Sequence, residues 1–175
     1  MAVLEGELIR LRPARSGDVP ALAAIRRAPE VHHHWRGGDD MVKAVEEDLV
    51  GPDVTSYVVE LEGRVVGYLQ WQAEEDPDYR HAELDIYLDP VVHGRGLGTD
   101  ALRTVARHLF ADHGHHRLQI DPAADNAAAI RCYTKVGFRP VGRLRLAERG
   151  NDGTWHDTLL MDLLAEEFGE LGGRP

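Results

Sequence analysis

A glycine-rich segment in the middle of the chain is the feature with the clearest chemical meaning. Residues 93–99 read HGRGLGT and stand between a run predicted as a strand and a long run predicted as a helix. At such a junction, successive backbone amides can converge on a phosphate at the positive end of the helix, and glycine lets the backbone approach closely. An ordinary helix cap could use the same residues. The segment has no Lys-Ser/Thr ending for a triphosphate, and the chain lacks the repeated βαβ halves of a dinucleotide domain.

The same segment resembles the signature of the GNAT family of N-acetyltransferases, which is Arg or Gln, two residues, Gly, any residue, then Gly or Ala. His93 stands at the first position, a departure from that pattern, and Gly96 and Gly98 stand at the two small positions. The resemblance covers nearly the whole chain and implies acetyl-CoA as co-substrate, with no metal. The residues that it implies for coenzyme binding are Tyr87, Leu88, His93, Gly94, Arg95, Gly96, Leu97, Gly98, Thr99, Asn126 and Tyr133.

The segment IDPAADNAAAIRCYTKVGF is similar to the strand and helix on the pantetheine side of that family. The resemblance implies that Asn126 meets the pantetheine arm and that Tyr133 meets the thioester sulfur, as a catalytic acid or hydrogen-bond donor to the departing thiolate. Each residue also has a structural interpretation. Asn126 is a good helix N-cap, and Tyr133 could be a core residue.

Within the family, the chain is most similar to the aminoglycoside 6′-N-acetyltransferases, through HHHWRGGDD, VVGYLQW and LQIDPAADNAAAIRCYTKVGF. This resemblance implies that Trp35 lines the acceptor cleft, that Asp85 faces the acceptor amine and that Asp121 holds an amino group. The acceptor would then be a small polycationic amine, acetylated by direct attack in a ternary complex. Acyltransferases of siderophore lysine side chains and of ribosomal-protein N-termini have similar sequences, and a catalytically silent acyl-CoA sensor is a further alternative.

The pattern of the strand predicted at residues 81–89 agrees with part of this assignment, because it places Glu83, Asp85 and Tyr87 on one face. Gln119 and Asp121 share a face of the next strand. A protonated amine is not nucleophilic, so a carboxylate must accept its proton before the thioester is attacked. Asp85 is the first candidate for this catalytic base and Glu83 the second. Asp85 could alternatively bind the amine without moving a proton.

Two groups of histidines, at residues 32–34 and at residues 113, 115 and 116, raise the question of a metal site. Three adjacent histidines in a loop cannot all face one ion, and no carboxylate is spaced to complete a ligand shell. We therefore predict no metal. The single cysteine, Cys132, cannot form an intramolecular disulfide.

Composition sets broader limits. A chain of 175 residues with 43% hydrophobic and 29% charged residues is predicted to form one domain, residues 1–175. Its formal charge of −10 repels nucleic acid and anionic lipid and attracts cations, although it could equally serve solubility. No apolar run reaches the roughly 18 residues that span a bilayer. We expect a cytoplasmic protein, either a monomer or a homodimer, with no membrane or nucleic-acid partner.

The elements that must position these residues form a mixed α/β (α+β) pattern. The predicted sheet is mostly antiparallel, with one splayed parallel strand pair and helices on both faces. Pro13 is expected to end the first strand, Ser16 to cap the first helix, and the tail at residues 166–175 to be flexible. Strands are predicted at residues 7–12, 55–61, 64–72, 81–89, 115–121, 138–148 and 154–163, and helices from Ser16 to before Pro29 and at residues 41–50, 99–113 and 126–136, with a loop at 30–40.

Overall fold

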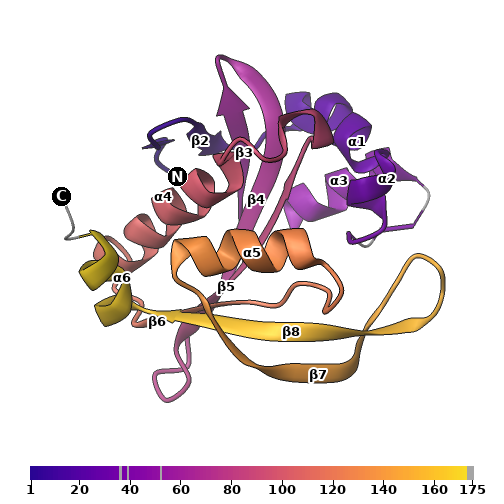
Figure 1. The fold of residues 1–175 in the computed structure, drawn as a ribbon. Helices are drawn as coiled ribbons and strands as arrows, with labels where there is room; N and C mark the ends of the chain where they lie inside the picture. Colours follow the sequence, from indigo (N-terminus) through magenta and orange to yellow (C-terminus); the bar gives the residue numbers. More distant parts are fainter. Residues whose placement is uncertain (36, 39, 52, 173–175) are drawn as a thin grey trace.

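The computed structural model describes residues 1–35, 37–38, 40–51 and 53–172, and they form one mixed sheet with helices on both faces (Figure 1). The strand order is β1-β2-β3-β4-β5-β6-β8-β7, and each neighbouring pair is antiparallel except β5 and β6. The strands are β1 (Leu4–Glu5), β2 (Arg10–Pro13), β3 (Val54–Leu61), β4 (Arg64–Glu74), β5 (His81–Leu88), β6 (Arg117–Ile120), β7 (Arg139–Arg149) and β8 (Trp155–Leu164). The predicted fold class is confirmed.

Two hydrophobic clusters lie on opposite faces of this sheet. One contains Leu102 and Val105 of α4 packed with Leu84 of the central sheet, and the other contains Leu22 of α1 and Val45 of α3. The helices are α1 (Val19–Arg26), α2 (Pro29–His32), α3 (Met41–Val50), α4 (Leu97–Ala111), α5 (Ala127–Val136) and α6 (Ala165–Gly172), with short 3₁₀ turns at Ser16–Asp18 (η1) and Pro90–Val92 (η2). Within the described ranges, no helix is both long and apolar enough to cross a membrane.

The parallel pair β5 and β6 separates after a short contact, and this separation creates the site. Their register pairs are Ala82 with Leu118 and Glu83 with Gln119. Beyond Glu83, strand β5 continues to Leu88 and pairs only with β4 in that register, as in Gln70 with Asp85. The edge of β5 that faces β6 is therefore open to a ligand over its last residues.

Several predicted elements have the expected bounds. Helix α3 runs from Met41 to Val50, and α5 starts after Asn126, whose side chain accepts a hydrogen bond from the amide of Ala129 at 3.1 Å. The β3–β4 hairpin turns at Glu62 and Gly63, whose φ angles of 52° and 78° suit a tight two-residue turn.

The N-terminal strand differs from the prediction. Residues 7–9 are a turn rather than a strand, because their backbone amides donate to the carboxylate of Asp100 at 3.1, 2.7 and 3.0 Å. Pro13 is the last paired residue of β2, opposite Tyr57, rather than the residue after the strand. Ser16 starts the 3₁₀ turn, and α1 begins only at Val19.

Two further bounds were wrong. Part of the predicted loop at 30–40 is the short helix α2, which Pro29 begins with its fixed φ. Helix α4 starts at Leu97, so Leu97, Gly98 and Thr99 belong to its first turn rather than to the loop. The tail that was predicted to be flexible includes α6, where Phe168 packs against Phe110 at 5.4 Å between ring centroids, and its flexibility stays a prediction. Residues 173–175 lie outside the described residues.

Candidate active site

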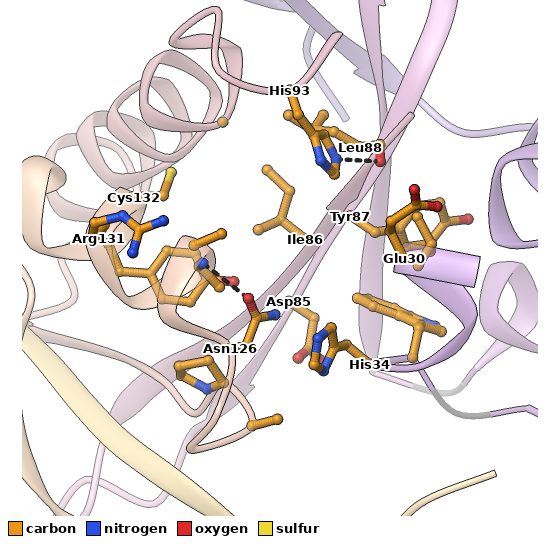
Figure 2. A pocket seen from close by; sticks show the side chains of 18 of the residues that line it. Glu30, His34, Asp85, Ile86, Tyr87, Leu88, His93, Asn126, Arg131 and Cys132 are labelled. Carbon is orange, nitrogen blue, oxygen red and sulfur yellow. Dashed lines mark hydrogen bonds between the residues drawn. The ribbon is translucent and has the colours of Figure 1, made fainter. Parts of the chain in front are cut away.

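A cavity of about 1000 Å³ opens where β5 and β6 separate, a volume suited to a sizeable ligand. Its walls come from parts of the chain that are far apart in sequence (Figure 2). They are the segment 29–35, Gln70 of β4, the end of β5, the glycine loop with the start of α4, residues 120–123, the inner face of α5, and Glu148 of β7.

The glycine loop borders this cavity. Gly94 and Gly96 have φ angles of 75° and 83°, a left-handed conformation that favours glycine, and Gly96 is the N-cap residue of α4. No side chain caps this helix within the described residues, so its first-turn amides can serve a ligand. A Cβ atom at Gly98 would lie 3.2 Å from Cys132 Sγ, which explains why a glycine lets α4 approach α5.

The predicted loop residues do not all contribute in the same way. His93 lines the cavity, and its Nε2 donates to the carbonyl oxygen of Leu88 at 3.0 Å (Figure 2). This hydrogen bond ties the loop to the end of β5. Arg95 instead borders a separate, smaller hollow with Glu62 and Arg64. In Arg95, the backbone rather than the side chain could therefore contact a ligand in the main cavity.

Asp85 lies in the cavity wall at the end away from the glycine loop. A chain of hydrogen bonds that begins in the core holds its side chain. Its Oδ2 accepts from Gln70 Nε2 at 2.9 Å, and Gln70 Oε1 accepts from the Tyr68 hydroxyl at 3.0 Å. That hydroxyl lies 2.7 Å from Ser56 Oγ, a buried side chain. The orientation of the Asp85 carboxylate is thus fixed by a chain of hydrogen bonds.

Glu83, the second candidate base, lies outside the described lining of the cavity. Its carboxylate accepts hydrogen bonds from Gln72 and Gln119 and lies 3.5 Å from His81. Burial acts to raise the pKa of Glu83, but the hydrogen bonds from Gln72 and Gln119 outweigh it and hold the pKa below its ordinary value. This placement makes Asp85 the better candidate.

Trp35 lines the cavity and meets two tyrosines. Its ring centroid lies 4.7 Å from that of Tyr87 and 6.2 Å from that of Tyr68, both in edge-on geometry. Trp35 also hydrogen-bonds to Asp48, which pairs with Arg26 at 2.7 Å. Burial raises the pKa of Asp48, and the Arg26 charge and the Trp35 hydrogen bond act against that rise. Trp35 is therefore held from two sides in the cavity wall.

Tyr87 and Tyr133 are both nearly buried, each with 7% of its surface exposed, and both line the cavity. Burial raises the pKa of each hydroxyl above its usual value, so both stay protonated at neutral pH. Tyr133 packs beside Phe138, with ring centroids 6.4 Å apart, and so belongs to the core as well as to the cavity wall. A protonated hydroxyl in this position can donate to a ligand atom.

Asn126, at the start of α5, and Asp121, directly after β6, both border the cavity. The Oδ1 atom of Asn126 caps α5, which confirms the structural interpretation of this residue. Its amide group still faces the cavity, so capping and a contact with a ligand are compatible (Figure 2).

Sequence reasoning assigned no site role to several charged or polar lining residues, namely Glu30, His33, His34, Gln70, Arg131, Lys135 and Glu148. Gln70 is the cross-strand partner of Asp85, which aligning β4 with β5 as a hairpin would have indicated. Arg131 and Lys135 are four residues apart on the inner face of α5, a helical spacing that was present in the sequence. Among the described residues, no group of three or more potential ligands is arranged to hold a metal ion.

The splayed parallel pair, the glycine loop and the open edge of β5 define an acyltransferase fold of the GNAT type. Residues 9–139 match the family model described as Acetyltransferase (GNAT) domain, and the chain belongs to this family.

The chain is similar to the aminoglycoside N(6')-acetyltransferase type 1 of Klebsiella pneumoniae, with 32% identity over 127 residues, which are 62% of this chain and 63% of that protein. The chain thus spans less than two thirds of that relative's length. It is also similar to the structure of AAC(6')-Ib in complex with parmomycin and acetyl-CoA, with a TM-score of 0.80 and 26% identity over 97% of this chain and 100% of that one. A structure from T. thermophilus has a TM-score of 0.88 at 24% identity, covering 98% and 93% of the two chains, and shows the same fold.

Proposed function

We propose that this protein transfers the acetyl group of acetyl-CoA to a primary amine of an aminoglycoside, by direct attack in a ternary complex. The observation that carries the proposal is the charged lining of the cavity. It includes the glycine loop, the start of α4, Arg131 and Lys135, and it also includes the carboxylates Glu30, Asp85, Asp121 and Glu148. The first group suits a phosphorylated coenzyme and the second group a polycation.

The coenzyme would bind with its pyrophosphate at the first-turn amides of α4 and with its pantetheine arm along the open edge of β5. The amides of Leu97, Gly98 and Thr99 stand at the positive end of a helix of 15 residues. Beyond Glu83, β6 no longer pairs with β5. The amide groups of the pantetheine arm can instead form hydrogen bonds with the backbone N–H and C=O groups along that edge of β5. Asn126 would meet the arm from the other side. The related AAC(6')-Ib structure, with acetyl-CoA bound, supports this assignment.

The cavity residues that the coenzyme does not occupy would carry out the reaction. Asp85, oriented by Gln70, would accept the proton of the acceptor ammonium, directly or through a water. The neutral amine then attacks the thioester carbonyl, forming a carbon–nitrogen bond as the carbon–sulfur bond breaks. The buried, protonated Tyr133 would donate to the sulfur and so stabilise the charge of the departing thiolate. The products are the N-acetylated amine and coenzyme A.

An aminoglycoside is favoured over a peptide N-terminus or a siderophore lysine because it presents several ammonium groups. A single amine would use one carboxylate, whereas the cavity has four among its described lining residues. The similarity to aminoglycoside acetyltransferases supports the same acceptor class.

The test is thiol release from acetyl-CoA, measured with a panel of aminoglycosides, polyamines, N-hydroxylysine and N-terminal peptides. Aminoglycosides should give the highest kcat/KM. Faster turnover of a peptide or of N-hydroxylysine would refute the acceptor and leave the acetyltransferase assignment intact. Binding of acetyl-CoA without turnover of any amine would favour an acyl-CoA sensor.

A further inference from the structure

The acceptor end of the cavity is bordered by two segments that are distant in sequence. The side chain of Asn151 connects them. Residues 29–35, including α2, form one wall, and Glu148 of β7 belongs to the other. Near Glu148, the turn of the β7–β8 hairpin reaches the segment after α2 (Figure 1). There Asn151 Nδ2 donates to the carbonyl oxygen of His32 at 2.7 Å and to that of Trp35 at 3.0 Å.

These two hydrogen bonds satisfy backbone groups that the local structure leaves without helical partners. Helix α2 has only four residues, and the carbonyls at a helix C-terminus need donors from elsewhere. The amide of an asparagine carries two N–H donors, and both distances are those of well-formed hydrogen bonds. The hairpin therefore holds the chain on either side of His33 and His34, which themselves line the cavity.

The hairpin turn itself is well braced, so Asn151 is a fixed donor. The amide of Gly150 donates to Thr154 O at 2.9 Å, and that of Gly153 donates to Gly150 O at 3.0 Å. Gly153 has a φ of 78°, which a residue other than glycine would adopt only with strain. In the same turn, Asp152 accepts from the amide of Thr154 at 2.9 Å.

We propose that Asn151 is a positioning residue that sets acceptor specificity by locking the Trp35 segment against the β7–β8 hairpin. This inference rests on the proposed function, because it assigns the wall to the acceptor. The Trp35 carbonyl is held by Asn151, and the Trp35 ring packs on Tyr87. Loss of the lock would let the Trp35 wall move relative to Asp85 and the glycine loop, neither of which Asn151 contacts in the described hydrogen bonds.

The test uses Asn151→Asp, which has nearly the same shape but turns a carboxylate toward two carbonyl oxygens. Loss of both hydrogen bonds predicts a roughly tenfold rise in KM for the aminoglycoside, with KM for acetyl-CoA within about twofold of wild type. Amide hydrogen exchange in peptides covering residues 29–35 should accelerate. Asn151→Ala should show the same pattern more weakly, because it removes the donors without adding repulsion.

Arg145→Gln is the matched control, because it makes the same change in net charge at an exposed position of β7 in the same hairpin. It should leave both KM values and the exchange at residues 29–35 unchanged. Wild-type exchange in Asn151→Asp, or an equal rise in both KM values, would overturn the proposal. If the wild-type enzyme turns over no aminoglycoside, the proposed function fails, whereas the exchange measurement still decides whether Asn151 locks the segment.

Discussion

Replacing Tyr133 with Phe separates the chemical role of this residue from its packing role. The ring lies in the core beside Phe138 and only 7% of the residue is exposed, so the phenylalanine should keep nearly all of the packing. Loss of one buried hydroxyl should change the free energy of unfolding by only about 1 kcal/mol. The charge on sulfur develops only during the reaction, so the same hydroxyl should matter much more for kcat.

The expected loss can be scaled from other preorganised donors to developing charge, whose removal lowers kcat by about 10²- to 10³-fold, or about 2.7–4 kcal/mol. We expect a fall of that size in kcat for Tyr133→Phe, with the Kd for acetyl-CoA within about twofold of wild type. Stopped-flow thiol release measures the first quantity and calorimetric titration the second. Tyr133→Ala is the packing control and should cost about 3–5 kcal/mol in unfolding. Equal losses in rate and coenzyme affinity in Tyr133→Phe would show that Tyr133 only packs.

Three further predictions follow from the same site and core. Acetyl-CoA at about 100 times its Kd should stabilise the fold by about 2.7 kcal/mol, and an unchanged Tm would refute its assignment. Asp121→Asn should raise KM for the aminoglycoside and leave KM for acetyl-CoA unchanged, while Asp85→Asn should also lower kcat. Kinetics with both substrates varied measure these constants, and an equal rise in both KM values would contradict the prediction. Burial lowers the pKa of His115, whose ring nitrogens have no hydrogen-bond partner among the described residues. The unfolded chain therefore binds the proton more readily, and stability should fall as pH drops below about 6.5. Urea unfolding at about pH 7.5 and about pH 5.5 tests this, and His115→Asn should narrow the difference.

The sequence predicted the elements whose signals are local. Helix α3 has an apolar repeat over its whole length, and the β3–β4 turn needs positive φ at Glu62 and Gly63. Trp35, Asp85 and Asp121 were predicted from resemblance, and the fold brings all three to one cavity. Lining a cavity does not fix which group binds and which reacts, so the kinetics of the Asp85 and Asp121 variants decide between these roles.

The errors arise where a distant side chain competes with a local pattern. Residues 7–12 have the approximate alternation of a strand, yet the Asp100 carboxylate accepts hydrogen bonds from the amides of residues 7–9 from more than 90 residues away. No local pattern can indicate that contact. Glu83 and Asp85 are equivalent by alternation on β5. They differ because Glu83 meets Gln119 across the parallel pair, whereas Asp85 lies beyond the point where β6 diverges. The position of that divergence decides which carboxylate faces the cavity.

The same reasoning explains why Asn151 could be read from sequence only as a turn residue. Asparagine in the run Asn-Asp-Gly is expected in a hairpin turn whatever its side chain contacts. Its hydrogen-bond partners are backbone carbonyls, which every residue has, so the sequence of the Trp35 segment gives no sign of the contact. A residue that acts on another segment's backbone is thus identified by the fold alone. The proposed acceptor wall depends on such a contact, whereas the proposed coenzyme-binding loop depends on glycines that are visible in the sequence.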